Sequence, residues 1–184
     1  MLTNTVLEHI LKTIPHLRVA VLGDLFLDRY LDIDPHLTEP SLETSLDAYQ
    51  VVGVRSYPGA AGTVINNLCA LGVKEVIPIS IIGDDGEGYE LRQALLNLNV
   101  VNLENVHSTK ERRTPTYTKP LMQPKASNEL PRELNRLDIK NRSPLPLALE
   151  NQLLASLVKI GGGIDVMLVL DQVSETDCGD LIQD

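Results

Sequence analysis

The sequence predicts an α/β fold in which helices cover both faces of a parallel sheet and a small second sheet projects from the body. Short apolar runs alternate with amphipathic helical segments along most of the 184 residues, the order that produces a parallel sheet buried on both faces. Residues 47–57 and 116–122 instead alternate polar and apolar side chains, a pattern that suits a half-exposed sheet. The composition, 43% hydrophobic and 22% charged, is that of an ordinary globular domain.

The first elements are a helix and a buried strand. Val6, Ile10 and Ile14 share one apolar face of a short helix, which ends at Pro15. Residues 18–23 are an apolar run closed by glycine, which predicts a buried strand.

A second helix and strand follow the half-exposed segment. The small residues at 59–62 predict a turn into a helix that Gly72 caps. Residues 75–82 predict the next buried strand, in which Pro78 suggests an edge or a bulge. The polar residues 83–88 then lead into a further amphipathic helix.

The second half of the chain continues the alternation. We expect strands at residues 99–103, 116–122 and 135–140. A last full helix around residues 153–158 and a glycine turn lead into residues 164–170, the most apolar strand of all.

The final residues predict the start of another helix. Ser174, with Asp177 three positions later, has the form of a helix N-terminus. The sequence stops a few residues further on, which leaves the last strand without a further neighbour. We therefore expect the C-terminal half of the fold to be missing from these 184 residues.

Charge and cysteine usage exclude several classes of protein. The net charge of -9 repels a phosphate backbone, so we expect no nucleic-acid partner. Cys69 and Cys178 have no partner at metal-ligand spacing, so no metal site is expected and a reducing compartment is favoured. No signal peptide and no run of about 18 apolar residues is present. We expect a cytoplasmic protein with no membrane contact.

A first motif that could bind a ligand is GDLFLDRY, at residues 23–30. It follows a predicted strand, and ligands in open α/β sheets bind beyond the carboxyl ends of strands. The carboxylate of Asp24 or Asp28 could accept two sugar hydroxyl hydrogens at once. The alternative is helix capping with a surface ion pair at Arg29.

Two glycine-containing motifs have competing interpretations. Small residues at 58–63 let the backbone approach a ligand closely, although a tight turn with close helix packing explains them equally well. Residues 83–88 resemble part of a calcium loop, but the spacing to a terminal glutamate fails and helix capping accounts for the carboxylates. Neither these motifs nor the glycines at 161–163 have the Gly-Lys-Ser/Thr pattern of a P-loop.

In combination and in this order, the motifs resemble the N-terminal half of the PfkB carbohydrate kinases of the ribokinase family. The pattern is a strand and GD-x-x-x-D-R-Y, an extended strand, P-G-x-A-x-x-V-x-x-N-L-x-A-L-G, and I-G-D-D-x-x-G. The first motif looks closest to the heptose-7-phosphate kinase branch. The resemblance covers residues 17–171, nearly the whole chain.

The resemblance implies a Rossmann-like α/β/α sandwich with a β-sheet lid, formed by residues 47–57 and 116–122, that closes over the sugar and often makes the dimer interface. We therefore expect a homodimer through the lid. The whole chain, residues 1–184, would be the N-terminal part of one kinase domain. The substrate-binding residues that the resemblance implies are Asp24, Asp28, Gly59, Ala60, Thr63, Lys119, Arg136 and Asp171.

The implied roles differ among these residues. Asp28 corresponds to the aspartate that binds sugar hydroxyls in the family, and Asp24 lies beside it in the GD pair. Lys119 and Arg136 could contact a substrate phosphate, and Asp171 matches a position that faces the sugar.

The sequence departs from the family pattern at three positions. The Gly-Gly-x-x-Asn sugar-binding turn of the family begins here at Gly59, but Ala60 replaces its second glycine and Thr63 replaces its asparagine. Gln172 follows Asp171, where the heptose branch has tyrosine. These changes leave the identity of the sugar open.

The resemblance implies ATP-dependent phosphorylation of a sugar or sugar phosphate by the intact protein, with ATP and Mg2+ as cofactors. The catalytic aspartate of the family lies in a Gly-x-Gly-Asp turn that this sequence lacks. We therefore expect no catalytic residue and no bound cofactor in this chain. The alternative is a non-catalytic sugar-binding or dimerisation module derived from a kinase, and a reading frame continuing through a Gly-x-Gly-Asp turn would favour the enzyme.

Overall fold

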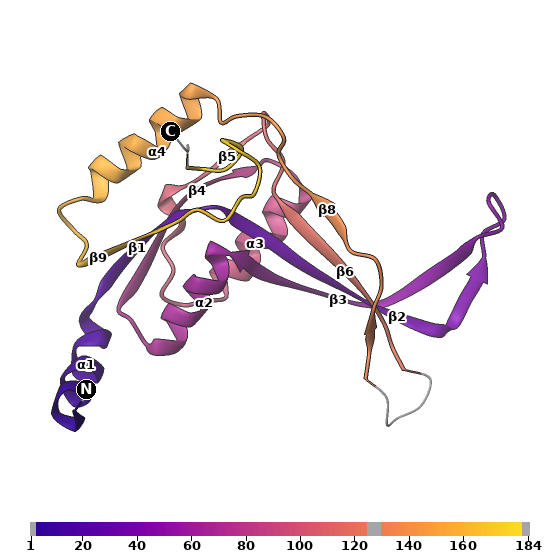
Figure 1. Ribbon diagram of the computed structural model, residues 1–184, viewed down its shortest axis with the longest axis horizontal. Helices are drawn as coiled ribbons and strands as arrows, with labels where there is room; N and C mark the ends of the chain where they lie inside the picture. Colours follow the sequence, from indigo (N-terminus) through magenta and orange to yellow (C-terminus); the bar gives the residue numbers. More distant parts are fainter. Residues whose placement is uncertain (1–2, 125–129, 182–184) are drawn as a thin grey trace.

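The body of the protein is a four-stranded parallel sheet between two layers of helices (Figure 1). The computed structural model describes residues 3–124 and 130–181. The strand order is β5-β4-β1-β9. The strands are β1 (Arg18–Gly23), β4 (Glu75–Gly83), β5 (Val106–Thr109) and β9 (Val166–Leu170). The predicted α/β/α class is therefore confirmed.

Side-chain alternation along β1 divides the core between the two faces of this sheet. Val21 packs with side chains of α2 (Ala61–Leu71) and α3 (Gly86–Leu96). Leu22 points the other way and packs against α4 (Leu147–Ile160). Both faces are thus covered, as the apolar character of the strands requires.

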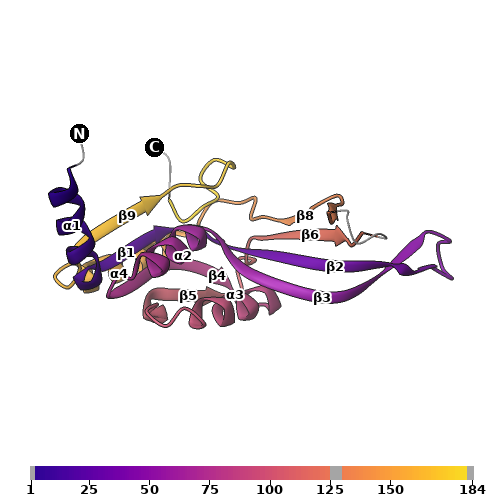
Figure 2. The same ribbon diagram turned by 90° about the horizontal axis from the view of Figure 1, so that it is seen from below.

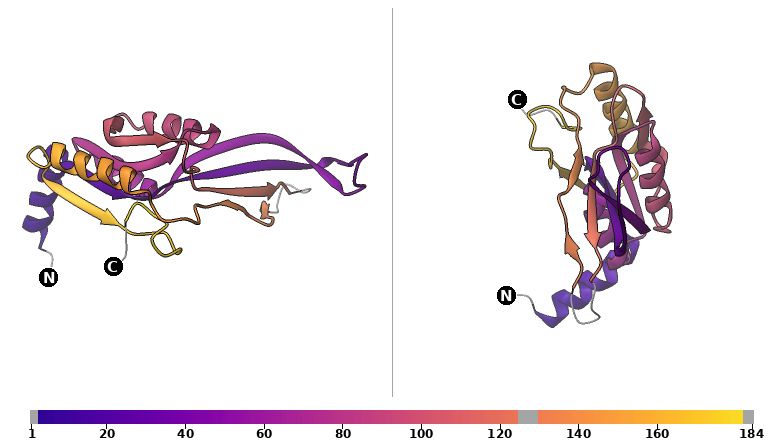
Figure 3. Two further views of the ribbon diagram at one scale, coloured as in Figure 1. Left: turned by 90° about the horizontal axis from the view of Figure 1, so that it is seen from above. Right: turned by 90° about the vertical axis from the view of Figure 1, so that its right-hand side faces the viewer.

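A second sheet projects from the body, and we call it the arm (Figures 2 and 3). Its order is β3-β2-β6-β7, and β8 also pairs with β6. The strands are β2 (Leu25–Pro40), β3 (Asp47–Ala60), β6 (Thr116–Met122), β7 (Arg132–Glu133) and β8 (Leu137–Ile139). The long β2–β3 ribbon extends well beyond the helices of the body.

The remaining elements are α1 (Asn4–Thr13) and two short 3-10 helices, η1 (Ile14–His16) and η2 (Leu103–Asn105). Thr3 caps α1 by accepting a hydrogen bond from Val6 N at 3.3 Å. The predicted first helix is confirmed, but none of its residues is buried. Within the described ranges, no helix is long and apolar enough to cross a bilayer.

Residues 25–40 differ most from the sequence-based expectation. The segment after Asp24 was expected to hold a ligand loop or a helix cap, whereas it forms a strand of 16 residues. β2 pairs antiparallel with β3 and parallel with β6. β3 follows β2 after residues 41–46 and forms a hairpin with it, whereas β6 lies far along the sequence, so a local pattern could not reveal that partner.

Pro78 lies inside the sheet, so the expectation of an edge position was wrong. On the side of β4 that faces β5, the Val76 N–H donates to the Val100 carbonyl oxygen, and the Val76 carbonyl oxygen accepts from Asn102 N. The next pairing on this side begins at Ser80, opposite Val106 of β5. Residues two apart in a strand point the same way. The missing N–H of Pro78 therefore falls in the gap between these two pairings and costs no ladder hydrogen bond.

Two further expectations are corrected. Residues 99–103 form only an isolated bridge, between Val101 and Val76, and the strand comes later, as β5. The helix expected from Ser174 is absent, because residues 171–181 form turns and bends in which Asp177 has a φ of 55°. This segment folds back over the carboxyl end of the sheet instead.

Candidate functional site

A pocket of about 330 Å³ lies where the arm joins the body. Its position after the carboxyl ends of β1 and β9 is the usual ligand position in open α/β sheets. Its lining combines one carboxylate, two cationic side chains, two aromatic rings and an amide. The lining residues are Phe26, Asp28, Ala60, Tyr117, Lys119, Arg136 and Gln172.

Asp28 enters the pocket because alternate residues of β2 share one face. The register places Asp28 beside Tyr117 of β6, and Tyr30 beside Lys119. The Asp28 Oδ1 atom lies 3.1 Å from Lys119 Nζ. Its Oδ2 accepts no hydrogen bond from the described residues, so this carboxylate retains an acceptor for a hydroxyl group.

Lys119 is held in place by both Asp28 and Tyr30. Its Nζ donates to the Tyr30 hydroxyl at 3.2 Å and lies 4.8 Å from the centre of the same ring. Partial burial lowers the pKa of Lys119 because it disfavours the charged form. The hydrogen bonds to Tyr30 and Asp28 raise the pKa by more, so the net shift is upward. The pocket therefore holds a fixed positive charge.

The backbone at Gly59 and Ala60 allows the close approach of β3 to Asp28. Gly59 pairs with Phe26, and a Cβ atom on Gly59 would lie only 2.9 Å from Asp28 Cγ. Ala60 turns the chain into α2 with φ 51° and ψ -120°, a conformation that glycine adopts far more readily. Thr63 is exposed on the first turn of α2 and does not line the pocket.

Arg136 closes another side of the pocket. Its guanidinium carbon lies 4.0 Å from the centre of the Tyr117 ring. It donates two hydrogen bonds to Asp138, at 2.6 and 2.8 Å, which raise the pKa of Arg136. The Tyr117 ring in turn packs against Phe26, with ring centres 5.1 Å apart.

Asp24 lies below the pocket and is not part of its lining. It is 5% exposed, and its Oδ1 accepts a hydrogen bond from Asp180 N at 2.8 Å. Its Oδ2 is buried and has no hydrogen-bond partner in the described part of the chain. Burial raises the pKa of Asp24, opposed by the Asp180 N–H and reinforced by the charge of Asp171.

Asp180 completes a buried carboxyl pair with Asp24. Its Oδ2 accepts from Ser80 Oγ at 2.6 Å and from Ile81 N at 2.9 Å. Burial and the charge of Asp24 both raise the pKa of Asp180. Arg112 lies nearby and donates to the Cys178 carbonyl oxygen. This pair holds residues 171–181 against the sheet.

Asp171 follows β9 and is exposed, whereas its neighbour Gln172 lines the pocket. The structure thus gathers Asp28, Ala60, Lys119 and Arg136 around one cavity, with Gly59 directly behind Asp28. Asp24, Thr63 and Asp171 lie outside its lining.

Of the alternative interpretation of the GDLFLDRY motif, the helix cap is wrong because the segment is a strand, whereas the ion pair at Arg29 is present. Arg29 points to the opposite face of β2 and bonds to Glu90 at 3.0 and 2.6 Å. Ser56 of β3 also donates to Glu90, at 2.8 Å. This cluster ties the arm to α3, while Asp28 pairs with Lys119.

The GDDGEG loop is a helix cap. Asp85 Oδ1 accepts from Gly88 N at 2.8 Å, and from Thr114 Oγ1 at 2.7 Å. Burial opposes the charged form, but these bonds outweigh it, and the pKa of Asp85 is lowered. Across residues 3–124 and 130–181, no three His, Cys, Asp or Glu side chains gather to hold a metal ion.

Sequence reasoning missed three residues of the lining, Phe26, Tyr117 and Gln172. The alternation of Phe26 and Asp28 along one strand was the available signal for the first. Gln172 reaches the pocket only because β9 pairs beside β1, a contact across most of the chain.

The chain is similar in sequence to proteins named Bifunctional protein HldE. It is 34% identical over 155 residues to the Bifunctional protein HldE of Citrifermentans bemidjiense, covering 84% of this chain and 30% of that protein. It is 31% identical over 180 residues to the protein of the same name from Syntrophotalea carbinolica, covering 98% of this chain and 34% of that protein. The chain thus spans about a third of the length of these relatives. No family model matches it.

Solved structures share the fold. The chain superposes on a Possible 1-phosphofructokinase from Thermotoga maritima with a TM-score of 0.55 and 13% identity, covering 86% of this chain and 46% of that one. For phosphofructokinase-2 from Escherichia coli in complex with fructose-6-phosphate, the TM-score is 0.53 and the identity is 18%. This superposition covers 84% of this chain and 45% of that one. At these identities, the likeness concerns the fold.

Proposed function

The chain is similar to the N-terminal half of the ribokinase-like (PfkB) carbohydrate kinases, and from this premise we propose that it forms the sugar-binding part of a kinase. The intact protein would transfer phosphate from ATP to a hydroxyl of a sugar or sugar phosphate. The sequence similarity to proteins named HldE and the GD-x-x-x-DRY motif make a heptose phosphate the first substrate to test. We propose a cytoplasmic location for it.

The observation that carries the proposal is that Asp28, Lys119 and Arg136 line the same pocket. A carboxylate with a free acceptor oxygen suits sugar hydroxyl groups. Two cationic side chains suit the phosphate of a sugar phosphate, through charge-assisted hydrogen bonds. The rings of Phe26 and Tyr117 offer the apolar wall against which a sugar ring can lie.

We propose no ATP site in this chain. The glycines at 161–163 stand beside Arg18, at the amino end of β1, and so at the opposite end of the sheet from Asp28. A phosphate bound there could not reach a sugar at Asp28. The role that we assign to this chain is to bind and orient the acceptor.

We also propose that two copies pair through the arm. Several apolar side chains on β3 are about half exposed, and such a surface needs a cover in a stable protein. They are Tyr49, Val51, Val52, Val54 and Tyr57.

A sugar-binding or dimerisation module without catalysis is the second candidate for this chain. It is favoured by the position of the glycine turn at residues 161–163, at the opposite end of the sheet from Asp28.

The test is calorimetry of the purified chain with hexoses, pentoses and heptose phosphates. We expect Asp28→Asn to weaken sugar binding by roughly 1.5–3 kcal/mol, the range for a hydrogen bond to a charged group. The melting temperature should change little. The matched control is Asp47→Asn, which neutralises an exposed aspartate on β3 away from the pocket.

Equal binding by the Asp28→Asn and Asp47→Asn variants would contradict the proposal. A collapse of the melting temperature in Asp28→Asn alone would show that this aspartate has a structural role.

A further inference from the structure

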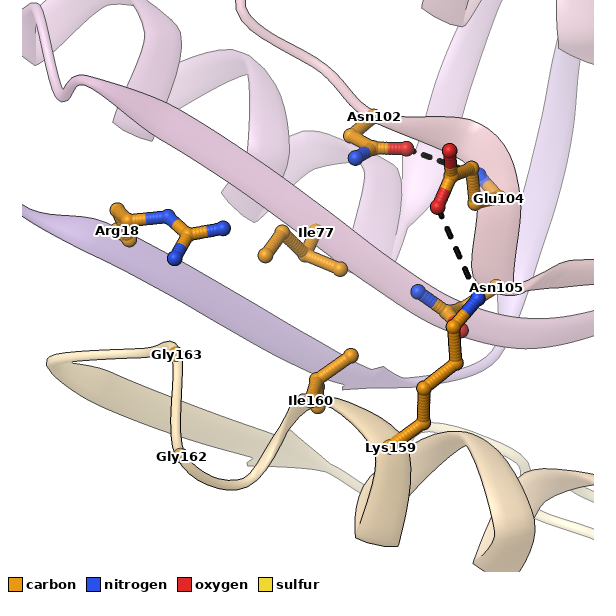
Figure 4. A pocket seen from close by; sticks show the side chains of 9 residues that line it. All are labelled: Arg18, Ile77, Asn102, Glu104, Asn105, Lys159, Ile160, Gly162 and Gly163. Carbon is orange, nitrogen blue, oxygen red and sulfur yellow. Dashed lines mark hydrogen bonds and ion pairs between the residues drawn. The ribbon is translucent and has the colours of Figure 1, made fainter.

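A second pocket, of about 220 Å³, lies at the other end of the parallel sheet (Figure 4). We call it the amino-end pocket, because Arg18, the first residue of β1, lines it together with Asn105 of η2 and Lys159 of α4. Ile77 and Ile160 provide apolar surface in the same cavity. No sequence motif predicts a site here.

Asn105 is the least expected of these side chains. It is only 4% exposed, yet its amide makes no hydrogen bond within the described residues. Figure 4 shows the side chain projecting into the pocket. The amide atoms make no hydrogen bond to the described residues and are not fully buried, so they are accessible to a ligand in the pocket.

Arg18 directs two further donors to the same space. Its Nε donates to Glu75 at 2.8 Å, which fixes the guanidinium. Neither of its terminal nitrogens has a partner in the part of the chain that the structure describes. Figure 4 shows the guanidinium pointing towards Ile77, across the pocket from Lys159. A planar pair of free N–H groups matches two oxygens of a phosphate or carboxylate.

Lys159 supplies a third donor at the mouth of the pocket. Its Nζ lies 3.8 Å from Glu104, and both side chains are about two-thirds exposed. Such a surface pair contributes little, so a dianion can compete with Glu104 for Lys159. Asn102, in contrast, is fully used, because its amide bonds to Glu75 and to Glu104 N.

We propose that the amino-end pocket binds a small phosphate-bearing anion, either inorganic phosphate or a phosphate carried by a short organic body. Donors from β1, η2 and α4 converge on one cavity, and Ile77 and Ile160 can take the carbon atoms. The volume suits a few carbon atoms and not a nucleotide. This site is separate from the Asp28 pocket and does not depend on the function proposed for it.

Binding would join three elements that are distant in sequence. The ligand would hold the turn between α4 and β9 to the start of β1 and to η2. Because it binds only the folded chain, it should raise the melting temperature increasingly as the ligand concentration exceeds the dissociation constant. The site would therefore couple the supply of a small phosphate to the stability of the β9 edge.

The test is a nuclear magnetic resonance titration of the chain at constant ionic strength. Inorganic phosphate and glycerol 3-phosphate are the probes, and glycerol is the neutral control. We expect the amide signals of Asn105, Gly162 and Gly163 to shift with either phosphate and not with glycerol. Tighter binding of glycerol 3-phosphate would support an organic phosphate, and equal binding would support inorganic phosphate.

Variants separate this site from general charge effects. Lys159→Gln and Asn105→Ala should each weaken binding about tenfold, the loss expected for one hydrogen bond to a charged group. Glu104→Gln should strengthen binding, because it removes the competing carboxylate. Lys110→Gln, which removes an exposed charge elsewhere, and Lys119→Gln, in the Asp28 pocket, should leave the dissociation constant at these amides unchanged.

Two results would overturn the proposal. One is the absence of shifts at the three amides at millimolar phosphate. The other is equal weakening by Lys159→Gln and Lys110→Gln, since binding would then follow net charge alone. Lys159 and Glu104 are exposed, so their variants remain informative if Asn105→Ala fails to fold.

Discussion

At the scale of single residues, Ala60 has a backbone conformation that suits another amino acid. Its φ of 51° with ψ of -120° lies in a region that glycine occupies readily and alanine does not. In the family pattern that the sequence resembles, the matching position is glycine. Strain is thus stored beside the pocket, at the junction of β3 and α2.

Replacing Ala60 with glycine should stabilise the protein. Relief of the strained φ outweighs the entropy that glycine adds to the unfolded chain, so we expect a gain of about 1 kcal/mol in the free energy of unfolding. Urea denaturation measures it. The control is Ala70→Gly, at an exposed helical position of α2, which should lose about 1 kcal/mol. Destabilisation by both variants would contradict the strain.

The buried pair of Asp24 and Asp180 should make stability depend on pH. Burial raises the pKa of Asp180 above the ordinary value of 3.8, so the folded state holds a proton that the unfolded state releases. Stability should therefore fall as the pH rises above 3.8. Asp180→Asn cannot release this proton, and its stability relative to the native chain should increase with pH.

Urea unfolding at a series of pH values between 4 and 7 measures this difference. The matched control is Asp177→Asn, which removes one carboxylate three residues earlier in the same segment and so accounts for the change in net charge. Parallel pH profiles for the native chain and Asp180→Asn would show that the pair does not share a proton.

At the scale of elements, the sequence predicted the strands that are apolar along their whole length. Residues 18–23 and 75–82 are apolar because helices cover both faces of β1 and β4, and both strands were found. β2 was missed, because one of its faces carries the charged pocket and the other carries Arg29. Its strand conformation depends on the hairpin with β3 and on β6, a distant partner that no local pattern encodes.

The same reasoning applies to the candidate site. Asp28 could be named from the family resemblance because it lies in the GDLFLDRY motif, whereas Lys119 and Arg136 lie outside the motifs and were named as cations that could contact a substrate phosphate. The turn of residues 171–181 could not be predicted, because it depends on the buried contact of Asp180 with Ser80, Ile81 and Asp24. The helix signal at Ser174 was overridden by that contact.

Pairing of two arms should be sensitive to charge on β3. Val54 is 58% exposed, and Val54→Lys would place an ammonium group in the proposed interface. We expect sedimentation at micromolar concentration to show a dimer for the native chain and a monomer for this variant. Val158→Lys, at an exposed position of α4, is the control. A native chain that stays monomeric with sugar present would exclude the arm interface.

At the scale of the whole molecule, the two sheets are joined by almost no connecting chain. β1 ends at Gly23 and β2 begins at Leu25, so Asp24 is the single residue between these two strands. A Cβ atom on Gly23 would lie 2.4 Å from the carbonyl oxygen of Leu170, which leaves no room for a larger residue. The pocket therefore lies at a rigid junction.

We expect these 184 residues alone to transfer no phosphate. Phosphoryl transfer depends on positioning and charge stabilisation around the nucleotide, and the described residues present no site for it. A coupled assay of ADP release across the same sugars measures turnover. A rate of about 1 per second or more, in a preparation free of host kinases, would contradict this and would place catalytic residues elsewhere in the chain.

Because β1 lies in the centre of the sheet, its two neighbouring strands become available at different times during synthesis. Its neighbours are β4 and β9, and Arg18 bonds to Asp165, a residue 147 positions later. At ribosomal rates of about 5–20 residues per second, β1 waits roughly 7 to 30 seconds for its second partner. During synthesis, one edge of the strand stays open over that interval, exposing a template for pairing with other nascent chains. Refolding of the finished chain, which needs no such wait, should then give less aggregate than synthesis without chaperones.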